Sequence, residues 1–343
     1  MADLLLEVGT EELPPGDVAP AVAQLGDSIA AALKMLRLDS GTLTTCATPR
    51  RLAVHVRNVA DRQRPDARRV RGPAATAAYD SQGRPTPAAE GFARSQGVPV
   101  ESLETVEETG GRRYVVAVKK ESGNRAADVL PGAIGSAITG LTFTKTMHWG
   151  TGDTRFARPI RWLLAILGPQ VLPVEVAGVR AGRTTYGHRA LAPGPRTIRR
   201  PNDYVASLAA AKVIVDPAKR RETIEQQARR LAGQVKGRVV LDPGLLEETV
   251  MSLEHPYALR GVFDRAFLSL PREVLVTVMQ HHQKYFSVED GRMSLLPVFI
   301  AVRDGGAAHA GTVRQGHEWV LAARLADAKF FFQEDRKKRL EHY

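Results

Sequence analysis

The sequence has a single cysteine, Cys46, among its 343 residues. One thiol excludes an intrachain disulfide and a zinc site built from several thiolates, which fits a protein of a reducing compartment. No apolar run approaches the roughly 20 residues of a membrane-spanning helix. The opening segment MADLLLEVGTEELPP has an acidic start and too short an apolar run for a signal peptide. We therefore expect a soluble, cytoplasmic protein without membrane contact.

Signatures of nucleotide and acyl chemistry are also missing. The sequence has no Walker-type phosphate loop, no dinucleotide fingerprint and no serine elbow. His281 and His282 are adjacent, so they point in different directions on a helix, and they do not form a metal-ligand pair. Neighbouring carboxylates such as Glu11 and Glu12 do not converge on one reacting atom. We expect no catalytic site and no metal site in this chain.

The sequence has few acidic residues relative to its basic ones, so its formal net charge is +11. Most of the basic residues are arginines. The segment 47–72 has eight arginines against two aspartates, and the segment 147–200 has nine arginines against two acids. The segment 241–290 is acidic instead. Arginine suits bidentate contacts with phosphate, so a polyanionic partner is the first hypothesis. The alternative is a solvated basic surface.

Hydrophobic periodicity predicts mixed elements in the first half of the chain. Leu4–Val8 is a predicted strand, and a helix capped by Asp17 follows it with apolar residues at three-four spacing. Arg51–Val59 alternates as a half-exposed strand does. The arginine-rich segment 57–73, which contains two prolines, predicts an exposed loop. Thr86 opens a short helix that stops at Gly97.

The second half predicts strands over 112–120, two adjacent strands within 161–179, a buried strand over 213–215 and a hairpin over 284–302. Helices are predicted over 204–211, 217–233, 245–253, 271–282 and 318–343. The elements do not alternate regularly, which favours a multidomain α+β fold of mixed sheets with packed helices. We divide the chain into residues 1–200, an α+β region with arginine-rich loops and a β-rich unit, and residues 201–343, a mixed region that ends in a long helix.

The stretch MHWGTGDTRFARPIRW, residues 147–162, gathers two of the three tryptophans with a phenylalanine, a histidine and three arginines. Basic residues interleaved with rings indicate a surface for nucleic acid, since guanidinium groups bind phosphates and rings stack on bases. A buried strand with arginines at its rim is the other interpretation. If a strand begins near Pro159, Trp162 belongs to the core and residues 147–158 form the exposed approach to it.

Several long blocks resemble one known family in the same order. These blocks are LLLEVGTEELPP, ATPRRLAVHV, RGPAATAAYDSQGRPTPAAEGFARSQGV, MHWGTGDTRFARPIRW, AGRTTYGHR, LSLPREVLVTVMQHHQKYFSVED and ARLADAKFFFQEDRKKRL. Together they resemble the β subunit of bacterial two-subunit glycyl-tRNA synthetases. The resemblance covers nearly the whole chain.

The resemblance implies a tRNA-binding and assembly subunit of a glycine–tRNA ligase, which converts ATP, glycine and tRNA-Gly to glycyl-tRNA, AMP and diphosphate. It further implies a heterotetramer of two α and two β subunits, with the aminoacylation site, ATP and magnesium on α and no cofactor bound by this chain. Such β subunits extend into a His-Asp-type domain and an anticodon-binding domain, so this chain corresponds to the N-terminal half. Part of it is similar to the editing domain of phenylalanyl-tRNA synthetase β subunits. Glycine is the smallest amino acid, so size exclusion reduces the need for editing.

The resemblance and the charge pattern together suggest tRNA contacts but no catalytic residue. The candidates are Arg50, Arg51, Arg68, Arg69, Arg71, Arg155, Arg158, Arg161, Arg183, His188 and Arg189. Two other functions compete with this one. The first is a stand-alone aminoacyl-tRNA deacylase that depends on His188, and the second is a purely structural docking module.

The chain departs from the family pattern at two places. The family usually has Gly-Asn-Glu and a basic residue where this chain has Gly316, His317, Glu318 and Trp319. Contacts made through the asparagine or the basic side chain are therefore lost, which leaves packing as the role of Trp319. At His255 the family more often has an aromatic residue, so local packing differs there.

Overall fold

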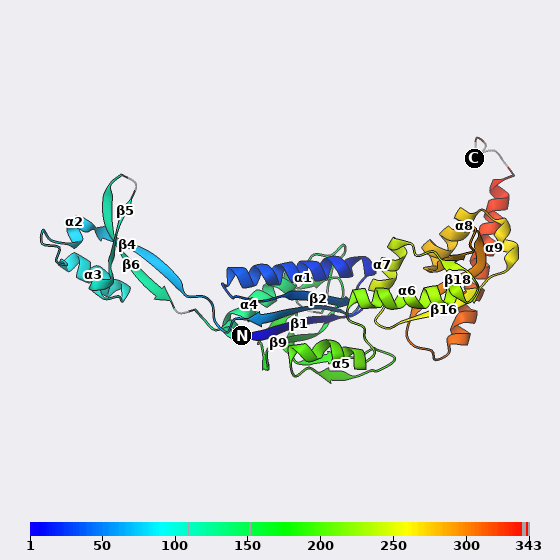
Figure 1. Cartoon of the computed structure of the whole chain (residues 1–343), viewed down its shortest axis with the longest axis horizontal. Coiled ribbons are helices and arrows are strands. Elements are labelled where there is room, and N and C mark those ends of the chain that lie inside the picture. Colours follow the sequence, from blue (N-terminus) through cyan, green and yellow to red (C-terminus); the bar gives the residue numbers. More distant parts are fainter. Residues whose placement is uncertain (109, 122, 151, 338–340, 342–343) are drawn as a thin grey trace.

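The computed structural model describes residues 1–108, 110–121, 123–150, 152–337 and 341. The molecule is elongated, with a small module of residues 66–121 projecting from one end, a layered central region, and a C-terminal region at the other end (Figure 1). Each region combines its own sheet with helices. The predicted α+β class is confirmed. None of the described helices combines the length and apolarity needed to cross a bilayer.

The central sheet is built around β1 (Ala2–Thr10), which lies antiparallel between β3 (Arg51–Val59) and β9 (Ile160–Leu167). Its strand order is β11-β12-β9-β1-β3-β2, with β10 also paired to β9. The outer strands are β2 (Leu43–Thr48), β10 (Gln170–Val171), β11 (Glu175–Val176) and β12 (Val179–Gly182). The predicted pair of strands within 161–179 is thus one long strand followed by much shorter ones.

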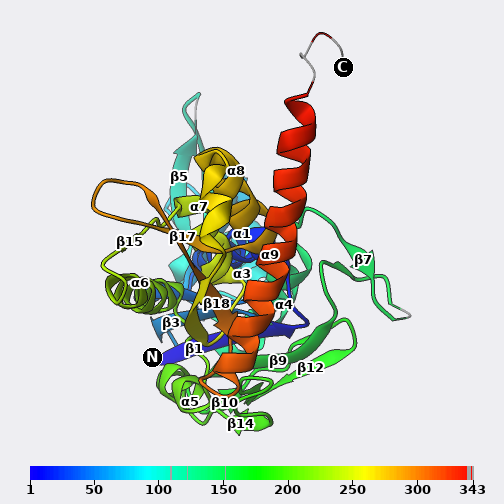
Figure 2. The ribbon, with the colours of Figure 1, turned by 90° about the vertical axis from the view of Figure 1, so that its right-hand side faces the viewer.

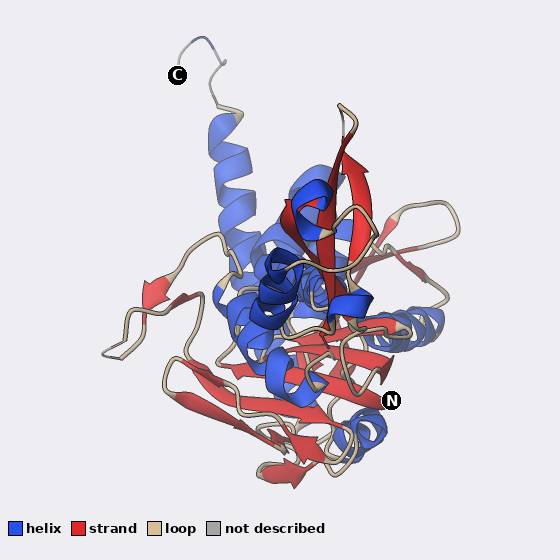
Figure 3. Ribbon diagram, turned by 90° about the vertical axis from the view of Figure 1, so that its left-hand side faces the viewer, coloured by secondary structure: helices blue, strands red, loops and turns tan. Residues whose placement is uncertain are grey.

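Both faces of β1 are buried. Successive side chains of a strand point to opposite sides of the sheet, so neighbouring residues of β1 pack into different layers. Leu4 and Leu6 pack with α1 (Pro15–Met35) and α4 (Ala126–Thr139), which cover one face of the sheet (Figures 1 and 3). Leu5 packs on the other face with Leu208 of α5 (Tyr204–Ala210). The same two layers enclose residues 51–54 of β3, so the prediction of a half-exposed strand is wrong there.

Helix α1 begins at Pro15 and is not capped by Asp17, contrary to the prediction. Proline has no N–H to donate and its ring fixes a helical φ, so it suits the first position of a helix. Asp17 is buried one turn inside instead, where its Oδ1 accepts hydrogen bonds from Thr144 Oγ1 at 2.7 Å and from Thr144 N at 3.2 Å. This carboxylate joins α1 to the segment that follows α4.

The projecting module is a three-stranded antiparallel sheet with small helices. It consists of β4 (Asp66–Ala74), α2 (Ala75–Ala78), α3 (Pro87–Gln96), a 3-10 turn at Val100–Ser102, β5 (Glu104–Glu108) and β6 (Arg112–Glu121). The predicted loop over 57–73 is therefore wrong from Asp66 onward, because β6 pairs with this arginine-rich segment. Gly72 is needed where β4 meets α3, since a Cβ there would lie 2.5 Å from the Phe92 ring. The predicted helix ending at Gly97 is confirmed, with that glycine at φ 68°.

Two small antiparallel ribbons lie outside the main sheets. They are β7 (Met147–His148) with β8 (Arg155–Phe156), and β13 (Thr184–Tyr186) with β14 (Pro195–Thr197). Residues 145–150 and 152–158, which we call the β7–β8 arm, extend away from the body of the protein (Figure 2). A 3-10 turn at Pro201–Asp203 leads into α5. The predicted strand over 213–215 is wrong, since Val213 and Val215 are buried but belong to no strand.

The C-terminal region has a four-stranded sheet of order β15-β17-β18-β16. Its strands are β15 (Arg238–Val239), β16 (Pro256–Val262), β17 (Phe286–Glu289) and β18 (Leu295–Asp304), and its helices are α6 (Pro217–Gly233), α7 (Pro243–Met251), α8 (Arg272–Thr277) and α9 (Ala310–Asp335). A 3-10 turn spans Arg265–Ser269, and a π-helical turn over Val278–His282 prolongs α8. The predicted hairpin is confirmed, whereas α9 begins at Ala310, earlier than predicted.

Consecutive residues of β18 point to opposite faces of the sheet and pack into two different hydrophobic clusters. Ile300 belongs to the large cluster that also contains Leu4 and the α6 residue Ile224, whereas Phe299 packs with Leu321 of α9. One cluster therefore crosses residue 200, and the division of the chain there stays a prediction. Helix α9 forms a long rod at the edge of the molecule (Figures 2 and 3).

His317 and Trp319, which belong to the same departure from the family pattern, have different surroundings. The Trp319 side chain is 77% exposed, so the expectation that it packs is wrong within the described residues. His317 faces inward instead, and its Nδ1 lies 2.8 Å from the Tyr285 hydroxyl. Burial and the nearby Arg303 lower the pKa of His317.

Candidate nucleic-acid interface

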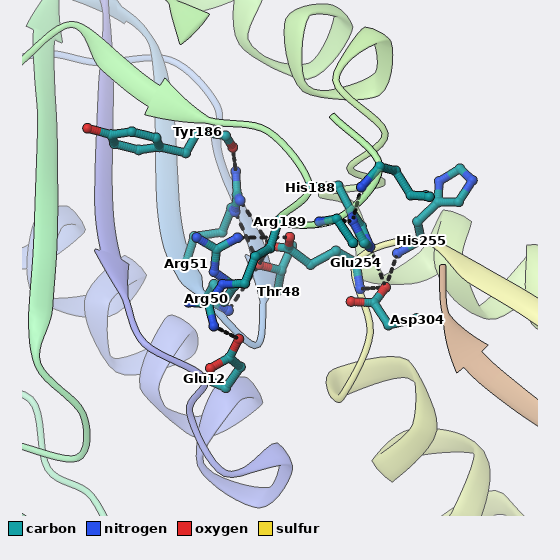
Figure 4. A network of polar contacts seen from close by, with 12 residues as sticks. Glu12, Thr48, Arg50, Arg51, Tyr186, His188, Arg189, Glu254, His255 and Asp304 are labelled. Carbon is teal, nitrogen blue, oxygen red and sulfur yellow. Dashed lines mark hydrogen bonds and ion pairs between the residues drawn. The ribbon is translucent and has the colours of Figure 1, made fainter. Parts of the chain in front are cut away.

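The predicted nucleic-acid contacts lie in three separate places. Arg68, Arg69 and Arg71 are on the projecting module, and Arg155 and Arg158 are on the β7–β8 arm. Arg50, Arg51, His188 and Arg189 lie together at a polar junction. Arg161 shares the carboxylate of Glu11 with Arg189, and Arg183 directly precedes β13. The polar junction is the set of contacts that joins the central sheet to the C-terminal region (Figure 4). It is formed mainly by Arg51 with Glu254, just before β16, and by His188 with Asp304, at the end of β18.

On the module, the arginines of β4 face glutamates of β5. Arg69 Nη2 lies 3.2 Å from Glu104 Oε2, and Arg71 Nη1 lies 3.2 Å from Glu108 Oε2. The Arg71 guanidinium also stacks 3.6 Å from the centre of the Tyr114 ring. The Arg68 side chain lies outside the described residues. Cross-strand pairing therefore neutralises much of the positive charge that the sequence run suggests.

On the arm, the guanidinium groups contact only neutral partners. Arg155 donates to Thr146 Oγ1 at 3.1 Å and lies 3.0 Å from His148 Nε2, while Arg158 donates to the Glu12 carbonyl oxygen at 3.0 Å. Both side chains are exposed. Because no carboxylate of the described residues pairs with them, the positive charge of these two arginines is not neutralised there.

The arm is held at its base by aromatic residues. Trp149 Nε1 donates to the Phe156 carbonyl oxygen at 2.9 Å, and the buried Phe156 ring packs edge-on against Phe143 at 4.6 Å between centroids. Aromatic pairs of this geometry add stability beyond their buried area. Residues 147–150 and 152–155 are thus an anchored, largely exposed ribbon, as the prediction of an exposed approach implies, whereas Phe156 and Ala157 are buried.

At the centre of the polar junction, Arg51 is fully buried in an ion pair. Its Nη2 lies 2.9 Å from Glu254 Oε1, and its Nε donates to Thr48 Oγ1 at 3.2 Å. Thr48 Oγ1 in turn donates to Glu254 Oε1 at 2.8 Å (Figure 4). Burial, the largest single influence, disfavours the charged form of Arg51, but the fields of Glu254, Glu7 and Tyr204 and the hydrogen bond to Glu254 together outweigh it and raise the pKa of Arg51. Arg51 cannot contact RNA in this arrangement, which corrects that prediction.

Trp162 belongs to the interior, as predicted, at 7% exposure. Its Nε1 donates to the buried carboxylate Oε1 of Glu7 at 2.6 Å, and Thr185 Oγ1 donates to the same oxygen at 2.7 Å. The indole lies over Gly9, where an added Cβ would fall 1.9 Å from the ring. The end of the stretch 147–162 is therefore core, while its beginning is surface.

His188 is buried and engaged, which corrects its assignment as a tRNA contact. Its Nδ1 accepts hydrogen bonds from the N–H groups of Ala190 at 3.2 Å and Leu191 at 3.1 Å, and its Nε2 lies 3.1 Å from Asp304 Oδ1. Burial alone would raise the pKa of Asp304, but hydrogen bonds from His188 and from backbone N–H groups hold it below its usual value. His188 thus ties the β13–β14 ribbon to β18.

The exposed rim of the junction is a network of paired charges. Arg189 contacts both Glu11 and Glu12, and Arg161 Nε lies 3.4 Å from Glu11 Oε1. The hydrogen bond from Arg189 is the main reason why the pKa of Glu11 is lowered. This rim joins the loop after β1 to β9 and to the β13–β14 ribbon, and it has little surplus charge.

Two further candidates lie beside the junction. Arg50 is largely buried, with Nη1 3.6 Å from Glu254 Oε2, and burial is the main reason why its pKa is lowered. Arg183 is half-buried and donates to the Pro169 carbonyl oxygen at 3.0 Å. Among the predicted contacts whose side chains are described, only Arg155, Arg158 and Arg183 have no carboxylate partner.

Sequence reasoning missed the acidic half of the junction: Glu7, Glu254 and Asp304. The sequence did indicate a role for Glu7. Its carboxylate interrupts the apolar run LLLEVG, and a carboxylate buried in such a strand needs hydrogen-bonding or ionic partners. The other two had no such signal, since they lie beside helix and strand ends. The described residues contain no group of three or more histidine, cysteine, aspartate or glutamate side chains arranged to hold a metal ion.

The sequence also matches known proteins over nearly its whole length. A family model described as glycyl-tRNA synthetase beta subunit matches residues 4–343. The chain belongs to this family. It is 46% identical over 338 residues to the glycine–tRNA ligase beta subunit of Moorella thermoacetica, covering 98% of this chain and 49% of that protein.

Other curated members are similar at the same level. The glycine–tRNA ligase beta subunit of Desulforudis audaxviator is 47% identical over 334 residues, which cover 97% of this chain and 48% of that protein. That of Anaeromyxobacter dehalogenans is 44% identical over 341 residues, with 99% of this chain and 48% of that protein covered. The chain spans about half the length of the family members it matches.

Proposed function

We propose that this chain is the tRNA-binding and assembly part of a heterotetrameric glycine–tRNA ligase that charges tRNA-Gly. The observation that carries the proposal is the family match over residues 4–343. Membership also favours a partner α subunit that holds the aminoacylation site, with ATP and magnesium bound there, and a cytoplasmic location. The editing-domain similarity to phenylalanyl-tRNA synthetase β subunits stays a prediction.

The β7–β8 arm supports the RNA part of this proposal. Arg155 and Arg158 present exposed guanidinium groups without carboxylate partners on a ribbon that extends from the body. Guanidinium groups in such positions attract the phosphate backbone and give an affinity that decreases steeply with salt. The paired arginines of the module and the rim are weaker candidates, since RNA would have to displace a glutamate from each of them.

The deacylase alternative loses support from the position of His188. A catalytic base must reach the water or hydroxyl from which it takes a proton. The buried His188 ring is engaged by Ala190, Leu191 and Asp304 instead. A purely structural docking module remains the competing function, and it predicts no salt-dependent RNA binding.

The test uses the full-length β subunit with the α subunit supplied. The triple variant Arg155→Ala/Arg158→Ala/Arg161→Ala should bind tRNA at least roughly tenfold more weakly than the parent, with a shallower dependence on salt. Binding to the α subunit should be unchanged. Arg84→Ala is the matched control, because Arg84 is an exposed arginine of the module that is paired with Asp80. Unchanged tRNA affinity in the triple variant would remove both the arm and the rim residue Arg161 from the interface, and the double variant Arg155→Ala/Arg158→Ala assigns any loss to the arm alone.

A further inference from the structure

A second basic site lies in the C-terminal region, away from every predicted contact. A pocket of about 500 Å³ is lined by Arg229 of α6, Arg238 of β15, Arg272 of α8 and Glu289 of β17. Strand β15 contacts both α6 and β17, and Arg272 of α8 reaches Glu289 of β17. Three guanidinium groups from three separate elements thus share one pocket with a single carboxylate.

The single carboxylate is buried and orients two of the arginines. Glu289 has a side chain only 5% exposed, and its Oε1 accepts a hydrogen bond from Arg272. Its Oε2 lies 3.8 Å from Arg238 Nη2, and Arg238 is its direct partner across the β15–β17 pairing. A carboxylate held between two arginines fixes their direction, because a guanidinium is planar and presents its donors in a fixed fork.

The arginines keep donors available for a ligand. The Arg238 side chain is 73% exposed although one of its nitrogens approaches Glu289. Arg229 is also mostly exposed and pairs only with Glu225, one turn earlier on α6. The three guanidinium groups face the two carboxylates of Glu225 and Glu289, so one positive charge is left in surplus to attract an oxyanion.

An adjoining pocket of about 560 Å³ shares Arg272 with the first. Its lining includes Arg265 and the apolar side chains Leu268, Leu270 and Met293, with Ser294 at the hairpin. We call the two pockets, which meet at Arg272, the groove: the first is cationic, and the second combines apolar side chains with the polar Arg265, Asp290 and Ser294. A nucleotide has the same division, with a charged phosphate beside a flat base.

We propose that this groove binds one nucleotide of a single-stranded RNA segment, with the phosphodiester against Arg229, Arg238 and Arg272 and the base in the adjoining pocket. The proposal rests on the RNA-binding function proposed above and adds a second contact on the C-terminal region. A free phosphate compound is the other source of the same chemistry.

The test measures binding of the 343-residue chain to a 12-nucleotide single-stranded RNA and, separately, to inorganic pyrophosphate. Arg238→Gln and Arg229→Gln should each weaken RNA binding about fivefold and reduce the slope of log affinity against log salt by about one. Arg180→Gln is the control, since Arg180 is 86% exposed and is paired across two short strands with Glu175, as Arg238 is with Glu289. It should leave RNA binding unchanged.

Each result has a defined meaning. Unaltered RNA binding in both groove variants overturns the proposal, and if the arm variants lose tRNA binding at the same time, the proposed function stands without the groove. Loss of pyrophosphate binding with RNA binding unaltered assigns the pocket to a free phosphate compound and overturns the RNA assignment. A parent chain that binds pyrophosphate but neither RNA nor tRNA contradicts the proposed function. If Arg229→Gln, Arg238→Gln and the control Arg180→Gln weaken RNA binding equally, the loss reflects the overall charge of the protein, and the proposal that the groove binds RNA is overturned.

Discussion

Arg51 and Glu254 form a buried ion pair between residues 203 positions apart in the sequence, with 2.9 Å between Nη2 and Oε1. Arg51 lies at the start of β3 in the central sheet, and Glu254 lies just before β16 in the C-terminal region. The pair therefore links two parts of the chain that have separate sheets. Its other contacts, with Thr48 and Tyr186, satisfy further hydrogen-bonding positions of the guanidinium and the carboxylate.

Removing either partner of this pair should strongly destabilise the protein. We expect Arg51→Met and Glu254→Gln each to lower the free energy of unfolding by about 3 to 5 kcal/mol, because the remaining buried group loses its partner. The double variant Arg51→Met/Glu254→Gln should lose less than the sum of the single losses. Urea unfolding measures all three. Additive losses would contradict a direct coupling.

The matched comparison is an exposed pair of the same chemistry. Arg69→Ala breaks the Arg69–Glu104 contact on the projecting module, where both side chains are at least half exposed. Its cost should be below about 1 kcal/mol, because water screens the charges and hydrates the glutamate that remains. A similar loss at both sites would mean that burial does not set the energy of the pair.

Gly9→Ala should destabilise the central sheet by about 3 kcal/mol or more, since the new methyl group would occupy the position of the Trp162 ring. The indole would have to move away from Glu7, so its fluorescence spectrum should change as well. Gly91→Ala is the control. Gly91 is an exposed residue within α3 with open space around it, and alanine there should stabilise the helix by about 0.5 to 1 kcal/mol.

Stability should decrease as the pH falls through the histidine range. Burial is the main cause that lowers the pKa of His317 from the ordinary value of 6.5, and burial likewise lowers the pKa of His55 and His255. The unfolded chain therefore takes up these protons first, so stability is complete above about pH 6.5 and decreases below it. His317→Gln should make this decrease shallower between pH 7.5 and 5.5 in urea titrations.

Tyr285→Phe separates the hydrogen bond of His317 from its titration. The variant removes the 2.8 Å contact to Nδ1 but keeps the imidazole. We expect lower stability at every pH with the slope against pH retained. A slope in His317→Gln equal to that of the parent would show that this histidine does not contribute.

Cys46 should react slowly with thiol reagents in the folded protein. Burial is the main cause that raises the pKa of its thiol from 9.0 to about 11. The thiolate fraction at pH 8 is then about 100-fold lower, and the higher nucleophilicity of the more basic thiolate recovers part of this loss. We expect labelling by a disulfide reagent to be roughly tenfold slower than in the urea-unfolded chain. Equal rates would contradict a buried thiol.

The local patterns of the sequence predicted the α+β class, the helix ending at Gly97, the hairpin near Asp290 and the interior position of Trp162. Each of these depends on neighbours within a few residues: a glycine that adopts a positive φ, turn residues, or the alternation of a strand. The prediction failed at residues 66–73, because arginines and prolines indicate a loop when the partner strand β6, more than forty residues further on, is not considered.

The residues of the candidate site were also only partly predictable from the sequence. Its basic residues stand out in the sequence as arginine-rich segments, and the arm with Arg155 follows from the composition of residues 147–158. The partners of those residues do not stand out, because Glu104, Glu254 and Asp304 come from distant segments. The groove arginines also escape notice, since they are single residues in three separate elements.

The sequence by itself determined the family, the mixed class of the fold and the excess of positive charge, because these depend on residue identity and short-range order. Only the tertiary structure decided which of those charges reach the surface unpaired. Arg51 and Arg155 look equivalent in the sequence, yet one is buried against Glu254 and the other is exposed on the arm. The physical reason is that the effective charge of an arginine depends on burial and on carboxylates supplied by distant segments.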